Sequence, residues 1–198
     1  DECTSGFRET FGGLHKKYGV EPEMAVFGKA LGNGYAITAV IGKRKIMEAA
    51  QSTFISSTFW TERIGPTAAQ KTLEVMEREK SWEKITNTGK AIGNRWQALA
   101  KKYELPIEIG GLPALVNFTI PVGNWLKYKT LITQEMLKKG FLAANSVYVC
   151  TEHTEKIVDD YFEKLDPVFS IIADCENGLN VDELLEGPVC HSGFKRLN

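Results

Sequence analysis

The chain has 198 residues, of which 43% are hydrophobic and 25% are charged, and its formal net charge is −1 at pH 7. A chain of this length and composition can bury an ordinary core, which excludes a disordered protein. Its near-neutral charge provides no basic field for nucleic acid or an acidic membrane surface, and no apolar run approaches the roughly 20 residues that span a bilayer. We therefore expect a soluble protein that binds a small molecule.

The four cysteines are scattered along the chain and form no CxxC pair. This spacing is not typical of a zinc site or of a dense disulfide framework, so we expect no bound metal. Reduced thiols in a cytoplasm are the expected state. The cysteines are Cys3, Cys150, Cys175 and Cys190.

The first 53 residues are rich in glycine, and their short apolar runs predict strands near Met24–Phe27 and 36–41. Apolar spacing then predicts a helix over Ile64–Glu79 and a better supported one over 81–103, which Ser81 caps at its start. We interpret residues 1–80 as part of a larger parallel sheet.

Apolar stretches at 114–120 and 141–150 flank a predicted helix over 127–139, which Gly140 closes. The strongest helical stripe covers 151–175, although Pro167 interrupts it, and a short helix is expected near 181–185. Helices thus alternate with short strands over residues 81–198, as in a self-contained domain.

Lys29 is the most informative residue, because it follows an apolar run and lies among glycines. A phosphate-binding P-loop fails, since Glu23 and Ala30 occupy its glycine and Ser/Thr positions. A dinucleotide fingerprint fails at Ile37, where a third glycine is needed. A lysine in a partly apolar pocket, able to form a Schiff base with an aldehyde, is the third possibility. The alternative is a solvated lysine in a surface turn.

Three segments decide between these possibilities: residues 1–8 (DECTSGFR), 19–23 (GVEPE) and 27–34 (FGKALGNG). In order and spacing they resemble the block around the cofactor lysine of class III aminotransferases, which are pyridoxal-phosphate-dependent. Residues 42–48 (GKRKIME) and 57–59 (STF) match further family motifs. The resemblance continues to 153–155 (HTE) and so covers most of the chain.

The chain departs from the family pattern at three places near the lysine. Cys3 replaces a valine that lies against the cofactor ring, Glu23 replaces an aspartate, and Asn33 interrupts a glycine triplet. Cys3 can still pack as a small apolar group, so the chemistry is unaffected. Residues 58–65 also replace a common family motif, in a variant similar to an aminomutase-like subgroup associated with surface-sugar biosynthesis.

The resemblance implies an α/β protein of fold-type I. Residues 1–80 would be the C-terminal part of the large domain, a remnant of its parallel sheet that contains Lys29, and residues 81–198 a small α+β domain. About half of the family's subunit, including its phosphate-binding loop, precedes residue 1. An isolated chain would accordingly have little or no activity.

The resemblance also implies roles in the site. Lys29 would hold pyridoxal phosphate as a Schiff base and move the substrate's α proton, Asp1 would pair with the pyridine nitrogen, and Cys3 would lie against the ring. Thr58 would donate its hydroxyl to the phosphate across the interface of a homodimer; the alternative for Thr58 is a helix cap or turn residue. No role in metal binding is implied.

The implied reaction moves an amino group between an amino donor and a carbonyl acceptor. The aminomutase of the family carries an acidic gate residue, but no acid occurs in residues 145–150, which favours transfer between molecules over glutamate-1-semialdehyde 2,1-aminomutase activity. A second alternative is that this chain is a non-catalytic C-terminal fragment. Glu62 and Arg63 either reach substrate or begin a helix. Arg8 is expected to be a structural, ion-pairing residue of the motif, with a substrate clamp as the alternative.

Overall fold

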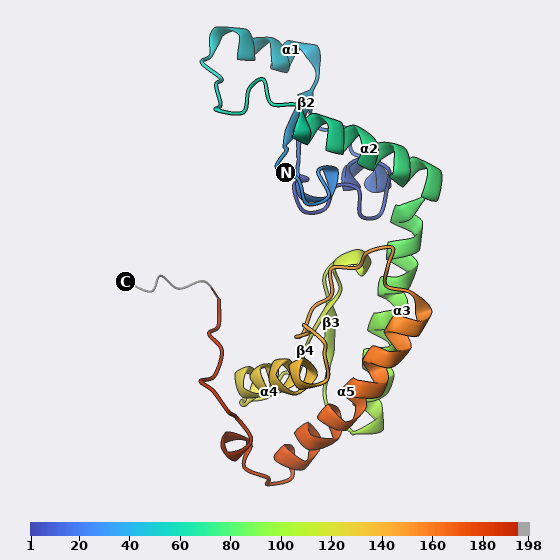
Figure 1. The fold of residues 1–198 in the computed structure, drawn as a ribbon, viewed down its shortest axis with the longest axis vertical. Coiled ribbons are helices and arrows are strands. Elements are labelled where there is room, and N and C mark those ends of the chain that lie inside the picture. Colours follow the sequence, from blue (N-terminus) through green and yellow to red (C-terminus); the bar gives the residue numbers. More distant parts are fainter. Residues whose placement is uncertain (194–198) are drawn as a thin grey trace. The chain divides into compact units, whose positions relative to one another are not determined.

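The computed structural model describes residues 1–193 (Figure 1). Its internal contacts divide the chain into two compact units, Asp1–Thr86 and a second unit that begins at Asn87. Each unit is described by itself below. None of the helices in the described part combines the length and apolarity that a bilayer crossing requires.

The first unit is organised around two short strands, β1 (Met24–Phe27) and β2 (Ala39–Gly42). They pair antiparallel, with Met24 opposite Gly42 and Phe27 opposite Ala39. The parallel pairing expected for this region is therefore wrong for these strands. The connection between them, residues 28–38, contains only a short 3-10 turn, and parallel neighbours need a longer crossover that is usually a full helix.

Short helical turns and one long helix complete this unit. A small core joins Ala25 and Phe27 of β1 to Leu31 of a turn and Ala69 of the long helix, since all four are buried and pack together. The elements are the 3-10 turns η1 (Leu14–Tyr18), η2 (Lys29–Leu31) and η3 (Glu48–Ser52) and the helices α1 (Arg44–Met47) and α2 (Ile64–Glu79).

Helix α2 has the bounds that the apolar spacing predicts, and Glu62 holds its start. The Glu62 carboxylate accepts hydrogen bonds from the backbone N–H groups of Ile64 and, at 3.0 Å, Gly65, which would otherwise lack partners at a helix N-terminus. The helix ends at Glu79 and is followed by Lys80, whose φ of +49° is left-handed. Glu62 is therefore a helix-start residue, one of its two predicted roles.

Helix α3 (Ser81–Lys102) follows directly and confirms the predicted helix, but Ser81 does not cap it. The Ser81 hydroxyl is buried and has no hydrogen-bond partner within the described residues. The first helical bonds run from the N–H groups of Glu83 and Lys84 to the Lys80 carbonyl. Lys80 thus occupies the capping position, and Ser81 lies one residue too late to cap.

The second unit contains most of α3, two further helices and a small sheet. Strands β3 (Glu108–Gly110) and β4 (Asn117–Thr119) pair antiparallel, and the extended segment near Ser146 bridges to Asn117. The helices are α4 (Trp125–Lys138) and α5 (Glu155–Glu176), with 3-10 turns η4 (Pro113–Leu115) and η5 (Val181–Glu183). Gly140 follows α4 with a φ of +85°, as its predicted closing role requires.

Helix α5 starts later than predicted and continues through Pro167. Thr154 caps its start by accepting a hydrogen bond from the Ile157 N–H, and His153 supports the turn before it by accepting a bond at 3.1 Å from the Cys150 N–H. The apolar stripe is buried as predicted, so its packing outweighs the backbone hydrogen bond that a proline removes.

Gly89 and Gly93 of α3 provide a matched test of packing in the second unit. A Cβ at Gly89 would lie 1.7 Å from the Pro113 carbonyl oxygen, whereas one at Gly93 would only reach ordinary contact at 3.4 Å from Ile109 and Val116. We expect Gly89→Ala to lower the free energy of unfolding by about 2–3 kcal/mol because backbone must move. Gly93→Ala should be neutral or stabilising by up to about 1 kcal/mol, since alanine favours helix. Urea denaturation measures both, and equal effects would contradict this packing.

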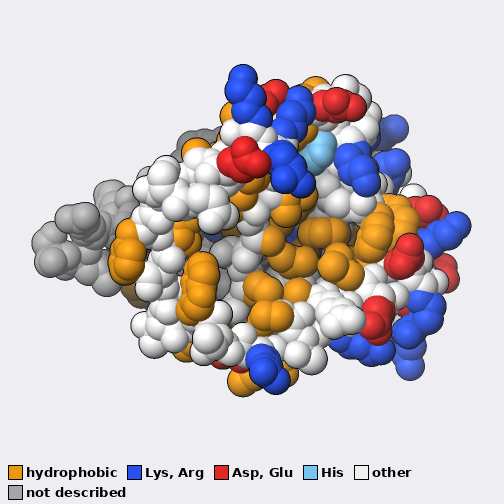
Figure 2. All heavy atoms as spheres, turned by 90° about the horizontal axis from the view of Figure 1, so that it is seen from above, with side chains coloured by type: hydrophobic (Ala, Val, Ile, Leu, Met, Phe, Trp, Pro, Cys, Tyr) orange, Lys and Arg blue, Asp and Glu red, His pale blue; other side chains and the backbone are white. Residues whose placement is uncertain are grey.

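Residues 1–86 expose many large apolar side chains. Figure 2 shows hydrophobic side chains gathered over the middle of one face, with charged side chains toward its margins. Apolar surface on this scale is typical of contact with other protein. The exposed large apolar residues of this unit include Tyr35, Val40, Ile41, Phe54, Ile55, Phe59, Trp60 and Ile64.

Candidate active site

Lys29 stands at the point where β1 ends and η2 begins. Gly28 is extended, and Lys29 has a φ of +41°, in the left-handed region that a side chain other than glycine rarely adopts. The turn is closed by a 2.9 Å hydrogen bond from the Leu31 N–H to the Gly28 carbonyl. Phe27 and Leu31 are buried on either side while Lys29 is exposed, so the expected partly apolar pocket is not formed by these residues.

The two glycines that flank Lys29 permit close approach of other groups. A Cβ on Gly28 would lie 2.8 Å from the Cys3 Sγ, and one on Gly32 would lie 2.1 Å from the Tyr35 carbonyl oxygen. Both distances are shorter than van der Waals contact. The glycines are therefore required by the fold of this loop.

The N-terminal segment lies beside the end of β1. The Glu2 N–H donates a 2.8 Å hydrogen bond to the Val26 carbonyl, which fixes the segment next to the lysine loop. The half-buried Cys3 packs against Gly28, and the exposed Asp1 carboxylate accepts a 2.8 Å bond from the Cys3 N–H through Oδ1. Asp1, Cys3 and the Lys29 loop are thus brought together.

The Lys29 amine has a specific partner that sequence reasoning missed. Its Nζ donates a 2.5 Å hydrogen bond to the Thr4 hydroxyl, across 25 positions of sequence. No pattern in the sequence around Thr4 predicts this contact, because it depends on how the N-terminal segment packs against β1. An amine, a carboxylate and a hydroxyl therefore stand on neighbouring backbone.

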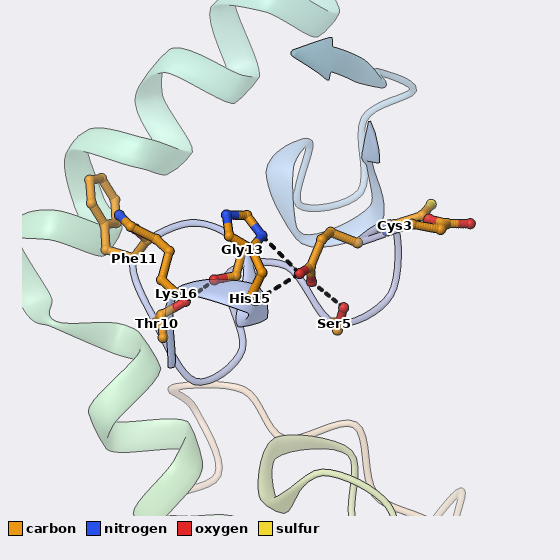
Figure 3. A network of polar contacts seen from close by, with 9 residues as sticks. Cys3, Ser5, Thr10, Phe11, Gly13, His15 and Lys16 are labelled. Atoms are coloured by element: carbon orange, nitrogen blue, oxygen red, sulfur yellow. Dashed lines mark hydrogen bonds and ion pairs between the residues drawn. The ribbon is translucent and has the colours of Figure 1, made fainter. Parts of the chain in front are cut away.

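Glu2 is buried and is hydrogen-bonded to Ser5 and His15, two residues that Figure 3 labels. Its carboxylate accepts hydrogen bonds from the Ser5 hydroxyl, from the His15 backbone N–H at 2.9 Å and from the His15 ring at 3.1 Å. Burial acts to raise the pKa of Glu2, but hydrogen bonds from Ser5, His15 and Leu14 outweigh it and lower that pKa to about 2. His15, which has no predicted role, is thus a structural partner of Glu2.

This network predicts a pH-dependent stability. Because the pKa of Glu2 falls from 4.5 to about 2 on folding, its carboxylate stabilises the fold above pH 4.5 and loses that effect as pH falls toward 2. We expect Glu2→Gln to lower the free energy of unfolding by about 2 kcal/mol at pH 7. The difference from wild type should shrink between pH 5 and pH 3 in urea denaturation.

Glu23→Gln is the matched control, since Glu23 is exposed and pairs with Lys43 on the surface. It should change the free energy of unfolding by less than about 0.5 kcal/mol. A difference between Glu2→Gln and wild type that does not depend on pH would show that the charge of Glu2 is not what stabilises the segment.

Thr58 is not brought to Lys29 by the described contacts. It lies exposed in the loop between η3 and α2, and no hydrogen bond of its side chain is found within residues 1–193. Its neighbours Phe59 and Trp60 are also exposed, at 72% and 68%. The loop thus exposes the Thr58 hydroxyl among solvent-exposed apolar side chains, an arrangement suited to contact with another protein surface.

Arg8 makes hydrogen bonds within the first unit. Its Nε donates a 3.4 Å hydrogen bond to the Thr4 carbonyl, and its own carbonyl accepts a 3.1 Å bond from the Thr86 hydroxyl. These contacts hold the turn that contains Thr4.

Comparison with known proteins gives a consistent result. The profile of the family described as Aminotransferase class-III matches residues 1–158. The chain is 33% identical over 162 residues to a 3-aminobutyryl-CoA aminotransferase of Cloacimonas acidaminovorans (strain Evry), covering 79% of this chain and 39% of that protein. It is 26% identical over 189 residues to a glutamate-1-semialdehyde 2,1-aminomutase of Sulfurihydrogenibium azorense, covering 87% of this chain and 44% of that protein. The chain thus spans less than half the length of these relatives.

Solved structures show the same fold. The FumI protein of Sphingopyxis sp. MTA144, in its PLP internal aldimine form, superposes with a TM-score of 0.83 at 23% identity, covering 93% of this chain and 45% of that one. An S-selective transaminase from Arthrobacter sp. gives a TM-score of 0.75 at 20% identity, covering 89% and 44%. These likenesses confirm the expected fold class, and this chain corresponds to less than half of each of those chains.

Proposed function

The chain belongs to the class III aminotransferase family, and on this premise we propose that it carries the pyridoxal-phosphate attachment site of a protein that transfers amino groups. The observation that supports this most directly is the exposed Lys29 amine, which contacts Thr4 next to Cys3, on a loop whose Gly28 packs against Cys3. The substrates would be an amino donor and a carbonyl acceptor.

The residues present fit pyridoxal phosphate. The cofactor needs an amine for its aldehyde, a carboxylate for its pyridine nitrogen and hydrogen-bond donors for its phosphate. Lys29 offers an exposed amine, and the hydrogen bond from Cys3 uses only one oxygen of the Asp1 carboxylate. Cys3 packs closely on Gly28, the residue that precedes Lys29.

Lys29 would have two tasks. Its Nζ would hold the cofactor covalently, and after release by an amine substrate the same Nζ would take the proton from the donor's α carbon and, in the second half of the transfer, supply a proton to the α carbon of the acceptor. When bound, pyridoxal phosphate accepts the electrons left as that proton departs. The Thr4 hydroxyl keeps the amine at a defined place on the loop.

Asp1 and Cys3 would hold the cofactor ring. A carboxylate at Asp1 would keep the pyridine nitrogen protonated, which strengthens the ring as an electron acceptor. The Cys3 side chain would lie against the ring face as a small apolar group. The positions of Asp1 and Cys3 depend on Glu2, which lies between them and holds the segment beside β1.

Thr58 would donate its hydroxyl to the cofactor phosphate of a second subunit in a homodimer. Its exposure, and that of Phe54, Ile55, Phe59 and Trp60 in the same loop, supports this proposal. Such a loop would be buried by a partner subunit, which removes the cost of exposing its apolar side chains.

Transfer between two molecules is favoured over intramolecular transfer. Residues 145–150 contain no acidic side chain, and the identity to the aminotransferase, 33%, exceeds the identity to the aminomutase, 26%. We further propose that residues 1–80 belong to the large cofactor-binding domain and 81–198 to the small domain, in a cytoplasmic protein with reduced cysteines. The division of contacts after Thr86 supports a boundary in this region.

Titration with pyridoxal phosphate tests this function. Its visible absorption should change saturably with the wild-type chain and not with Lys29→Ala, and the protein that contains this chain should transfer amino groups from a panel of amines to 2-oxo acids. Equal absorption changes in both chains would contradict the proposal. Cofactor binding without amino transfer by the 198-residue chain alone would support the non-catalytic alternative for that chain.

A further inference from the structure

We propose that Thr4 is the positioning residue of the Lys29 amine, an inference that rests on the proposed role of Lys29. The Thr4 hydroxyl accepts a 2.5 Å hydrogen bond from Nζ, and this bond joins the N-terminal segment to the lysine loop. Thr4 would act through Lys29 and need not touch the cofactor.

Thr4 is well placed for this task because its backbone is held on both sides. Its neighbours Glu2 and Ser5 are joined through the buried Glu2 carboxylate, and the Glu2 N–H is bonded to β1. The Thr4 carbonyl accepts a bond from Arg8. A hydroxyl on such a fixed turn can orient a flexible side chain at little further cost in entropy.

The partner of Lys29 differs in kind from those of other lysines. The other hydrogen-bonded lysines within residues 1–193 contact carboxylates or, for Lys16, a backbone carbonyl. A hydroxyl orients the amine without placing a negative charge beside it. Because one N–H of Nζ satisfies the bond, the remaining positions on the nitrogen stay open for reaction.

Lys80 is a natural comparison inside the same unit. It is exposed, and its φ of +49° is close to the +41° of Lys29. Its ammonium makes no hydrogen bond among the described residues. Lys29 and Lys80 are therefore matched in backbone φ and exposure, and they differ in the hydrogen bond from the Lys29 amine to a hydroxyl.

Exchange of the ammonium protons with water, followed by NMR on the ¹⁵N-labelled chain, tests the bond itself. Exchange should be about fivefold slower at Lys29 than at Lys80 in wild type and in Thr4→Ser, and about equal at the two lysines in Thr4→Val. Thr4→Val keeps the shape of threonine and loses only the hydroxyl, so folding should persist. Equal exchange in wild type would overturn the inference, whatever the cofactor does.

Reductive labelling with pyridoxal phosphate and borohydride tests the positioning role. Thr4→Val should slow labelling of Lys29 about fivefold relative to Lys80, and Thr4→Ser should restore it. If wild type labels Lys29 selectively and Thr4→Val does so equally well, the positioning role is wrong while the proposed function stands. If wild type shows no preference for Lys29, the proposed function fails and the positioning role falls with it, although the exchange measurement still decides whether the bond exists.

Discussion

Replacing Lys29 by arginine is expected to lower the rate of amino transfer by the protein that contains this chain about a thousandfold or more. Arginine keeps the positive charge and approximate length, but its guanidinium stays protonated at any working pH. It can neither attach to an aldehyde nor take a proton from the substrate's α carbon. The loss should therefore be chemical, with the fold retained.

Lys80→Arg is the control, since Lys80 matches Lys29 in exposure and in backbone φ. The rate of transfer to a carbonyl acceptor should be unchanged in this variant. Retention of most of the activity by Lys29→Arg would remove Lys29 from the chemistry and would direct attention to another lysine.

The second large effect is on stability, at Trp96. This side chain is fully buried, its ring lies 4.7 Å from that of Phe118, and its indole N–H donates a 3.1 Å hydrogen bond to the Tyr161 hydroxyl. Burial raises the pKa of Tyr161 while the bond from Trp96 acts to lower it. We expect Trp96→Ala to lower the free energy of unfolding of the second unit by about 4 kcal/mol, through lost burial and an unfilled cavity.

Trp60→Ala is the matched control, because Trp60 is 68% exposed. Its effect on the free energy of unfolding, measured in urea and followed by circular dichroism, should stay within about 0.5 kcal/mol. Trp96→Phe should fall between the two, since it keeps much of the packing and loses the hydrogen bond. If Trp96→Ala lowers the free energy of unfolding by less than about 1 kcal/mol, the core of the second unit does not depend on Trp96.

Sequence periodicity located the elements whose stability comes from a buried apolar face. Helix α2 has the predicted bounds, α3 starts as predicted and ends one residue early, and α4 starts two residues early and ends one residue early. Pro167 was expected to interrupt α5 and does not, because its neighbours Leu165, Val168 and Phe169 are fully buried and hold the helix together. Local propensity yields to tertiary packing there.

Features that depend on a single backbone angle or on strand pairing were not predicted. The Ser81 cap fails because Lys80 adopts a left-handed φ and takes the capping position. The strands of the first unit pair antiparallel, although the wider family fold suggests a parallel sheet. Neither the φ of one lysine nor the direction of a four-residue strand leaves a periodic signal in the sequence.

The candidate site was predicted in part. The motif around Lys29 indicated the lysine, Asp1 and Cys3, and the structure brings these segments together. Thr4 and Glu2 stand in the same motif but their roles depend on partners at Lys29 and His15, 25 and 13 residues away. Thr58 remains a proposal, because its expected partner belongs to a second subunit.

Mapping the site of covalent attachment tests the central claim most directly. The purified chain is mixed with pyridoxal phosphate, reduced with borohydride and digested, and peptide mass spectrometry locates the phosphopyridoxyl group. A single label at Lys29, with the other exposed lysines such as Lys80 unmodified, is the predicted result. A label spread over surface lysines, or confined to a different one, would contradict the assignment of Lys29 as the attachment residue.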